Sequence, residues 1–349
     1  RRRSARDRGV DPVADDPSPE KTVKFGPIDT AQAEGAVLAH SIALPSGRLR
    51  KGLRLEPAHL AALRAEGIDS IIVAQLASGD VDENTAAAQV AQAVLAAHPQ
   101  LTMTRAFTGR VNLLADGPGV AQLDVGALEA LNAVHPMITL ATVPPFQQMA
   151  AGGMVATIKI ISYAVAQSDL AAACDAGRGA IRLVPPQIRD ATLIITEIDG
   201  GAGDKGKKAI ADRLSALDVD LKKVVMVPHE VTALRDAIAA ADTALTLILT
   251  GSATSDIDDV APQALRAAGG EVSRFGMPVD PGNLLFLGHR GDTPVIGLPG
   301  CARSPALNGA DWVLSRVICG VDVTPRDIAG MGVGGLLKEI VTRPQPRRG

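Results

Sequence analysis

The chain has 349 residues, of which 46% are apolar and 21% charged, ordinary values for a globular protein of two or three domains. Its 35 basic and 38 acidic residues leave a net charge of −3, and aromatic residues are only 2%. Proteins that bind nucleic-acid strands need a basic surface and aromatic side chains on which bases stack, so we expect no nucleic-acid partner. The three cysteines show no CxxC or disulfide pattern. No apolar run approaches the roughly 18 residues that span a bilayer, so we expect no membrane partner. No apolar segment follows the arginine-rich start, so no signal peptide is predicted. We therefore expect a cytoplasmic protein with reduced cysteines.

Residues 1–22 are predicted to be a disordered arm. They begin RRRSARDR and continue with DPVADDPSPE, a charged and proline-rich stretch without apolar periodicity. The alternatives are a solvated tail and an arm for nucleic acid or a membrane surface. The solvated tail is favoured, because blocks of like charge are usually solvated.

Residues 23–180 are predicted to form an N-terminal α+β region. Strand patterns lie at residues 36–42, 70–76, 103–114, 137–142 and 154–161. Helix patterns lie at 56–66, 82–97 and 124–134. Strands and helices do not alternate strictly here, so this region does not indicate a parallel sheet.

Residues 181–324 alternate regularly and predict an α/β domain with a doubly wound, mostly parallel sheet. Apolar strands are expected at 191–197, 223–227, 245–250 and 293–296, and helices at 205–217, 230–240, 260–268 and from about 305 to Cys319. The glycine-rich and Pro-Pro stretch 174–186 is expected to link this domain to the preceding region. Residues 325–349 are expected to be a short packed piece followed by a tail or linker.

A ligand is expected at the carboxyl ends of these strands, where open parallel sheets bind their ligands. The loop TGSATSDIDDVAP follows the strand 245–250 and opens a helix. Its glycine allows close backbone approach, and its hydroxyls can donate to a phosphate beside the helix N-terminus. The residues concerned are Thr250, Gly251, Ser252, Thr254 and Ser255.

The same loop carries the carboxylates of Asp256, Asp258 and Asp259 within four positions. Such a cluster is costly unless a cation, a proton or a helix N-terminus offsets the repulsion. Capping of the helix by Asp258 or Asp259 is the structural alternative. Capping explains one aspartate easily and two only with strain, so we favour a hard cation held by these oxygens. The six histidines show no HxxxH or HxH spacing, which argues against a transition metal.

Two further loops qualify as ligand-binding segments. The stiff turn MPVDPGN offers Pro281, Gly282 and Asn283, with a plain connection between strands as the equal alternative. The turn GLPGCARSP lies before a helix and offers Pro299, Gly300, Cys301 and Ser304, with Arg303 as a further phosphate partner. Cys301 has no identifiable histidine partner, so a packed small residue is more frequent than a nucleophile in this setting.

Taken together, the three loops resemble those of the molybdopterin-binding domain family, which includes molybdopterin adenylyltransferase and molybdopterin molybdenumtransferase. TGSATSDIDDVAP looks like the family's glycine-rich acidic loop, PVDPGN like its Pro-Gly loop and GLPGC like its third loop. IITEIDG with Asp204 and Lys205 resembles the first strand and loop. The chain departs from the family at Ser252, where a second glycine is usual, and at Thr254.

The N-terminal half also resembles a longer bacterial and archaeal subgroup of molybdopterin-binding proteins. The similar segments are AEGAVLAHSI, the RKG turn at 50–52, and GDV at 79–81 followed by Glu83-Asn84. In such relatives a domain similar to the cofactor cytidylyltransferase can follow the tail.

The resemblance implies a role in molybdenum-cofactor biosynthesis. The phosphate of molybdopterin would dock on the Gly251 loop, with Asp199 and Lys205 of the first loop beside it. Asp256, Asp258 and Asp259 would hold Mg²⁺ or position the phosphate. The implied chemistry is nucleotidyl transfer from ATP or insertion of molybdate.

Two alternatives stay open, and a homo-oligomer is compatible with each. The first is a non-catalytic carrier that delivers the cofactor to a nucleotidyltransferase or an apo-molybdoenzyme. The second is an unrelated α/β binder of sugar phosphates or nucleotides.

Overall fold

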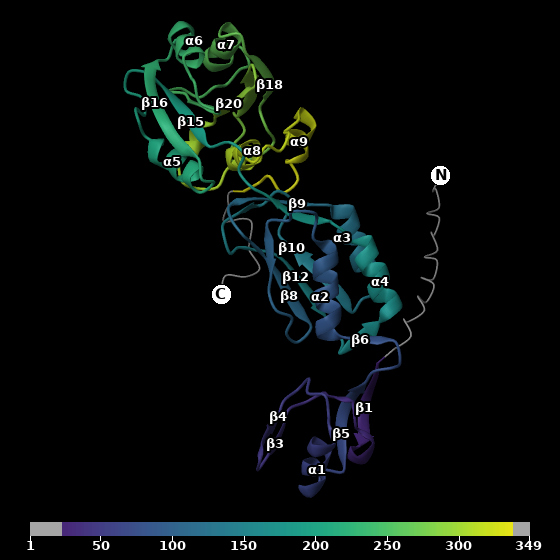
Figure 1. The fold of residues 1–349 in the computed structure, drawn as a ribbon. Helices are drawn as coiled ribbons and strands as arrows, with labels where there is room; N and C mark the ends of the chain where they lie inside the picture. Colours follow the sequence, from purple (N-terminus) through teal and green to yellow (C-terminus); the bar gives the residue numbers. More distant parts are fainter. Residues whose placement is uncertain (1–22, 338–349) are drawn as a thin grey trace, which may run out of the picture.

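The computed structural model describes residues 23–337, so the arm predicted at 1–22 and the end of the predicted tail lie outside the described residues. Figure 1 shows three parts that follow one another along the chain, with the N-terminal part at one end and the C-terminal part at the other. Within residues 23–337, no helix has the length and apolar character needed to cross a membrane.

The N-terminal part is a small antiparallel sheet, in the order β1-β5-β2, covered by one helix. Its elements are β1 (Lys24–Asp29), η1 (Thr30–Gln32), β2 (Val37–Leu38), β3 (Ile42–Leu44), β4 (Gly47–Leu49), α1 (Pro57–Ala65) and β5 (Ser70–Gln75). The predicted helix at 56–66 and strand at 70–76 are confirmed. The predicted strand at 36–42 is wrong as one element, because β2 pairs with β5 whereas β3 forms a separate hairpin with β4.

The middle part packs three helices against short antiparallel sheets. Its elements are β6 (Asp80–Asp82), α2 (Glu83–Val94), β7 (Leu101–Met103), β8 (Arg110–Ala115), β9 (Gly119–Leu123), α3 (Val125–Val134), β10 (Ile138–Thr142), β11 (Gln148–Met149), β12 (Met154–Ile160), β13 (Ala164–Ala166), α4 (Gln167–Ala176) and β14 (Ile181–Val184). Asp82 starts α2 by accepting hydrogen bonds from the backbone of Asn84 and Thr85. The strand predicted at 103–114 is two strands, because the chain reverses at Thr108 and Gly109, both with positive φ.

The stretch expected to link this region to the α/β domain is largely regular structure. Helix α4 extends to Ala176, and β14 pairs antiparallel with β9 in the middle part. The reason is apolar alternation: Ile181 and Leu183 are both buried in the core of the middle part. The domain boundaries at 23–180, 181–324 and 325–349 themselves stay a prediction.

The C-terminal part is a six-stranded sheet in the order β16-β15-β17-β20-β19-β18. Its elements are β15 (Asp190–Glu197), α5 (Lys207–Ser215), β16 (Asp220–Pro228), α6 (Val231–Ala239), β17 (Thr246–Leu249), α7 (Val260–Ala267), β18 (Glu271–Phe275), β19 (Phe286–Arg290), β20 (Thr293–Leu298), η2 (Gly300–Arg303), α8 (Gly309–Ile318) and α9 (Pro325–Gly330). Strands β16, β15, β17 and β20 are parallel, and β19 and β18 form an antiparallel edge.

Side chains of this sheet are buried on both faces. Leu193 and Ile195 of β15 pack in one cluster with α5 and α8. Ile194, between them, packs in another cluster with α6 and α7. Figure 1 shows the two helix pairs on opposite sides of the sheet. The predicted α/β fold with a doubly wound, mostly parallel sheet is confirmed, and burial on both faces explains the nearly continuous apolar strands.

Candidate functional site

Four loops of the C-terminal part meet at one edge of the sheet. Strands β15, β17 and β20 are parallel, so the loops after them leave from the same, carboxyl edge. Strand β19 is antiparallel to both of its neighbours, and therefore β18 also ends at this edge. The four loops are residues 198–206, 250–259, 276–285 and 299–308. All three ligand-binding loops predicted from the sequence, and the first loop with Asp199 and Lys205, lie here.

The loop after β17 is held close to β15. The backbone N–H of Gly251 donates to Thr196 Oγ1 over 2.9 Å, and that hydroxyl lies 2.8 Å from His229 Nδ1. A Cβ on Gly251 would lie 2.7 Å from the carbonyl oxygen of Thr196, so only glycine allows this approach. Thr250 and Thr254 are buried, with Thr250 Oγ1 donating to the carbonyl of Ser252 over 2.6 Å. Glycine is therefore required at position 251 because the loop packs closely against β15. The sequence analysis expected this glycine to allow the close approach of a ligand.

The hydroxyls of this loop differ in exposure. Ser252 and Ser255 are exposed, whereas the buried Thr254 hydroxyl lies 3.2 Å from that of Thr250. The two serine hydroxyls are thus the ones at the surface where a ligand would arrive.

The three carboxylates of the loop each have a local partner. Asp259 caps α7, accepting from the N–H groups of Val260 at 2.7 Å and Ser255 at 3.0 Å. Asp256 accepts from the N–H of Asp258 at 2.8 Å, and Asp258 forms a 2.7 Å ion pair with Arg266. Helix capping, the structural alternative in the sequence analysis, is therefore observed at Asp259.

The three aspartates were predicted to hold a cation. Across residues 23–337, no group of three or more His, Cys, Asp or Glu side chains is arranged to hold a metal ion. Turn and capping hydrogen bonds direct the three carboxylates to different partners. Cation binding by Asp256, Asp258 and Asp259 stays a prediction.

Arg303 joins the first two loops. Its guanidinium donates to the carbonyl of Thr250 over 2.8 Å and also to the carbonyl of Lys205. A Cβ on Gly206, whose φ is +98°, would lie 2.9 Å from the Cα of Arg303. Arg303, expected to bind phosphate, is thus engaged by backbone oxygens, whereas the side chains of Asp199 and Lys205 are exposed.

Arg213 of α5 holds the loop after β20. Its guanidinium donates to the carbonyls of Ala302, Ser304 and Ala306 at 2.8–3.0 Å. It also pairs with Asp311 of α8 at 2.5 Å, and both side chains are nearly buried. The sequence analysis missed Arg213, because its partners lie about ninety residues away in the chain and no local pattern marks it. In this loop Pro299 is buried, Cys301 is half-buried, and Gly300 and Ser304 are exposed.

The loop after β18 is joined to the start of α8. The N–H of Gly309 donates to the carbonyl of Pro281 over 2.8 Å, and the Asp280-Pro281 peptide bond is cis. Gly282 has a φ of +140°, and a Cβ there would lie 2.7 Å from the Gly309 nitrogen. Asn283 is exposed, with its carbonyl accepting from Met277 N–H. The predicted turn therefore lies against the third loop, on the side of the edge away from β16.

Comparison with known families identifies a related domain family for the C-terminal part. The family model described as a probable molybdopterin binding domain matches residues 191–317. This segment belongs to that domain family. The match includes all four loops of the carboxyl edge, and the resemblance inferred from three of them is confirmed. The domain is thus related to molybdenum-cofactor biosynthesis. A second family model, a domain of unknown function (DUF8806), matches residues 27–75 of the N-terminal part.

Several solved structures are similar to the chain. The molybdopterin biosynthesis MoeA protein from Pyrococcus horikosii is 12% identical, with a TM-score of 0.29, over 88% of this chain and 76% of that one. The molybdopterin biosynthesis enzyme MoaB from Thermus thermophilus is 20% identical, with a TM-score of 0.28, over 44% of this chain and 100% of that one. A molybdopterin biosynthesis protein from Mycobacterium abscessus is 15% identical, with a TM-score of 0.28, over 39% of this chain and 94% of that one. No curated protein matches the sequence.

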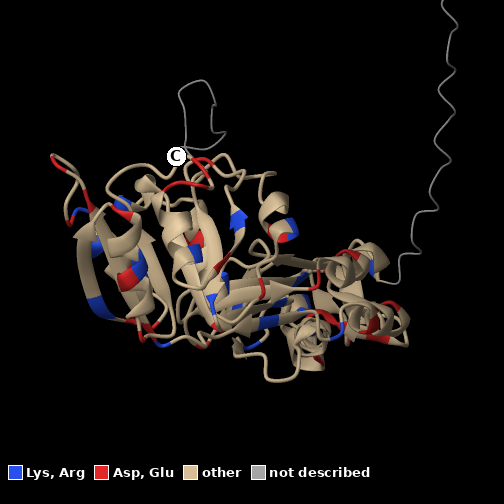
Figure 2. Cartoon of the chain, turned by 90° about the horizontal axis from the view of Figure 1, so that it is seen from above, with Lys and Arg blue, Asp and Glu red and all other residues tan. Residues whose placement is uncertain are grey.

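Charge is mixed over the surface around the molybdopterin-binding domain. Figure 2 shows Lys and Arg interspersed with Asp and Glu over the elements visible in that view. Short-range pairs such as Arg266 with Asp258 and Lys208 with Asp212 account for part of this mixture. A small phosphate would therefore meet local donors in the loops rather than a broad basic field.

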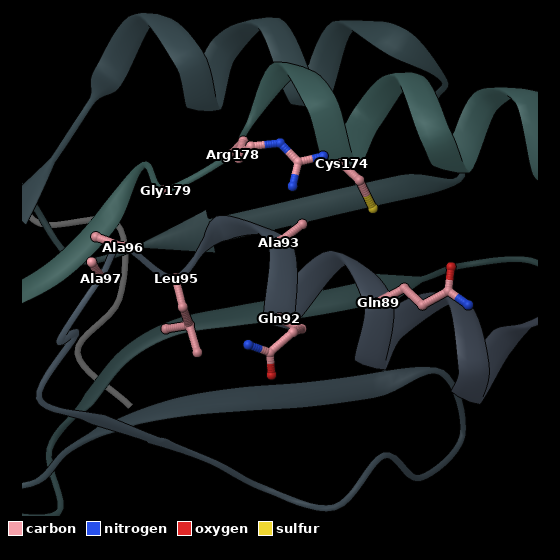
Figure 3. Close-up of a pocket in the computed structure, with 9 residues that line it drawn as sticks. All are labelled: Gln89, Gln92, Ala93, Leu95, Ala96, Ala97, Cys174, Arg178 and Gly179. Carbon is pink, nitrogen blue, oxygen red and sulfur yellow. The ribbon is translucent and has the colours of Figure 1, made fainter.

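A hollow of about 570 Å³ lies away from the molybdopterin-binding domain, between α2 and the end of α4. Figure 3 shows Gln89 and Gln92 on α2, and Cys174 and Arg178 on the opposite side of the hollow. Arg178 is paired with Asp175 at 2.5 Å. None of the predicted site residues lines this hollow.

The thiol of Cys301 is expected to react slowly near neutral pH. Burial raises the pKa of Cys301 above its ordinary value, so the thiolate, which is the nucleophile, is scarcer than in a free thiol. Alkylation by iodoacetamide should be slower than for glutathione at pH 7 and should rise with pH as the thiolate forms. Peptide mass spectrometry of timed samples measures the rate. Alkylation as fast as glutathione at pH 7 would contradict the expected pKa.

The other cysteines supply the internal control. Burial also raises the pKa of Cys174, and it raises that of Cys319 to about 12. Cys319 is almost fully buried and should stay unmodified until the protein unfolds. The expected order of reactivity therefore places Cys319 last.

Proposed function

We propose that this chain binds molybdopterin at the carboxyl edge of its six-stranded sheet, as a component of molybdenum-cofactor biosynthesis. The observation that carries the proposal is the junction of four loops within the family-matched segment 191–317. Arg303 ties the loops after β15 and β17, and Gly251 packs on Thr196. Pre-set backbone geometry of this kind lowers the entropic cost of binding a small anion.

The phosphate end of molybdopterin is placed on the loop 250–259. Ser252 and Ser255 have exposed hydroxyls there, and Lys205 is exposed on the neighbouring loop. The segments 281–283 and 299–304 would line the pterin end, with Asn283, Gly300 and Ser304 at the surface. A lysine and two hydroxyls suit a terminal phosphate, because each supplies a hydrogen-bond donor.

Mg²⁺ fits this loop only as an ion shared with the ligand. Magnesium is commonly bound by one or two carboxylates together with substrate phosphates, rather than by a complete protein cage. Asp256 and Asp258 are exposed on the loop that would hold the phosphate, whereas Asp259 caps α7. When bound there, the ion would neutralise the charge of the phosphate, and Asp256 and Asp258 would position the ion. If the protein is an enzyme, ATP or molybdate would be its second substrate.

Two roles follow for such a protein. In the first, it is an enzyme that transfers a nucleotidyl group from ATP to molybdopterin or loads molybdate. In the second, it is a carrier that hands the cofactor to a nucleotidyltransferase or an apo-molybdoenzyme. A cytoplasmic location and a homo-oligomer stay predictions.

The double variant Asp256→Asn/Asp258→Asn is expected to weaken Mg²⁺-dependent binding of molybdopterin at least about tenfold, because amides do not supply the charge that a hard cation needs. Asp259→Asn is the matched variant and should bind normally, since asparagine caps a helix as well as aspartate. Isothermal titration with MgCl₂ and with EDTA measures the effect. Equal binding by wild type and the double variant would remove magnesium from the proposal, and no binding by folded wild type would remove the proposal itself.

Product formation separates the enzyme from the carrier. Purified molybdopterin is incubated with the protein and Mg²⁺, once with ATP and once with molybdate, and the pterin is identified by mass. A nucleotide-linked or metal-loaded product supports the enzyme, whereas tight binding without either product supports the carrier. In that case Ser252→Gly, which restores the family's second glycine, shows whether the loop regains activity.

A further inference from the structure

A second cavity lies between the middle part and the C-terminal part, and none of the residues that line it belongs to the four loops of the proposed molybdopterin site. It has a volume of about 530 Å³ and lies between the segment 144–147 of the middle part and helices α8 and α9. The volume is within the roughly 300–1,000 Å³ typical of small-molecule sites.

The guanidinium of Arg316 is the unusual group of this cavity. It lies over the ring of Phe146, with 4.3 Å between Cζ and the ring centroid. Its Nε is buried and has no hydrogen-bond partner among the residues that the structure describes. Within residues 23–337, no carboxylate forms an ion pair with Arg316. Buried polar groups are normally hydrogen-bonded, so the guanidinium of Arg316 is short of acceptors among the described residues.

The carboxylate of Asp327, which also lines the cavity, is hydrogen-bonded to Thr324. Asp327 Oδ2 accepts from both the backbone N–H and the hydroxyl of Thr324, at 2.8 and 2.6 Å, where they start α9. Arg326 also lines the cavity, so two cations face one carboxylate. Burial lowers the pKa of Arg316, because the charged guanidinium loses hydration. Arginine nevertheless stays protonated at neutral pH. The excess positive charge favours an anion.

The aromatic residues define the rest of the ligand. Phe146 is covered by Arg316, and Trp312 lines the cavity one helical turn away on α8. We propose that this cavity binds a small flat-ringed anion, a ring that carries one carboxylate or phosphate group. The oxyanion pairs with the forked guanidinium of Arg316, assisted by Arg326, and the ring lies beside Trp312. This site is separate from the proposed molybdopterin edge and does not depend on it.

Trp312 reports binding directly, because it is the only tryptophan of the chain. Its fluorescence is followed during titration with AMP and with nicotinate, and with their uncharged counterparts adenosine and nicotinamide. We expect quenching, with the charged member of at least one pair binding about tenfold or more tighter, because the charge-assisted hydrogen bonds are absent from the neutral one. The two pairs distinguish a phosphate from a carboxylate ligand. If neither charged compound binds more tightly than its counterpart, the proposal is overturned.

Three variants test the residues. Arg316→Met keeps the stem that packs on Phe146 and should abolish the preference for the charged compound. Arg326→Gln, at an exposed position, should weaken binding about threefold, in keeping with an exposed charge contact. Arg235→Met, on α6 and paired with Asp236, is the matched control and should bind as wild type does.

The outcomes are decisive even if one variant misfolds. Circular dichroism establishes whether Arg316→Met is folded, and unchanged binding by the folded variant contradicts the proposal. If it does not fold, unchanged binding by Arg326→Gln contradicts it instead. Asp258→Asn, in the loop after β17, does not line the cavity and should leave the fluorescence titration unaltered, which separates this cavity from the proposed molybdopterin site.

Discussion

Replacing Arg213 with methionine is expected to lower the free energy of unfolding by about 3–5 kcal/mol, the usual cost of removing one partner from a buried ion pair. Arg213 pairs with Asp311 at 2.5 Å, and the two side chains are only 11% and 14% exposed. The substitution leaves the Asp311 charge without its cation and three carbonyls of the loop after β20 without their donor. Denaturant unfolding followed by circular dichroism gives the free energy.

Two further variants separate this ion pair from a general effect of losing arginine. Arg235→Met breaks an exposed pair with Asp236 and should cost less than about 1 kcal/mol. In Arg213→Met/Asp311→Asn the orphaned charge is removed, so the loss should be smaller than for Arg213→Met alone. A loss below about 1 kcal/mol for the single variant would show that the pair does not stabilise the fold.

Gly297→Ala is expected to destabilise the C-terminal sheet by about 3 kcal/mol, at the upper end of the usual cost of overpacking a core. Gly297 on β20 is paired with Phe286 on β19, and a Cβ would lie 1.9 Å from the Phe286 ring. That ring is 1% exposed and packs against the cluster of α6 and α7, so it has little room to move. Thermal and urea unfolding measure the loss.

A compensating variant tests the contact itself. In Gly297→Ala/Phe286→Leu the ring is gone, and the double-mutant cycle should show a favourable coupling of about 1 kcal/mol or more. Gly26→Ala on β1 is the matched control, since nothing lies within 4 Å of a Cβ there, and it should change stability by less than about 0.5 kcal/mol. Strict additivity in the cycle would contradict the steric explanation.

The fold of the C-terminal part was largely predictable because its signals are local. The apolar run 191–197 and the helix pattern 260–268 appear as β15 and α7 with small changes at their ends. The antiparallel edge formed by β18 and β19 was missed, since Gly288 and the exposed positions of β18 interrupt the apolar pattern. In the middle part, short strands joined by tight turns were merged into longer ones, as at 103–114.

The candidate site was predictable only as a set of loops. Glycine, proline and hydroxyl residues at strand ends carry a local signature, so Gly251, Pro281 and Pro299 were found without coordinates. The roles inside the loops were not, because they depend on which neighbour each side chain reaches. Arg303 was expected to bind phosphate and instead donates to two loop carbonyls.

By itself, the sequence determined the α/β class of the C-terminal part, the order of its main elements and the family of residues 191–317. These follow from apolar periodicity, helix caps and turn residues, which act over a few neighbouring positions. Only the tertiary structure decided that Asp259 caps α7 and that Arg213 holds a loop about ninety residues away. It also decided that the Nε of Arg316 is buried without a hydrogen-bond partner among the described residues. The physical reason is that charged and polar side chains are paired by proximity in space, and the chain brings their partners together only when it folds.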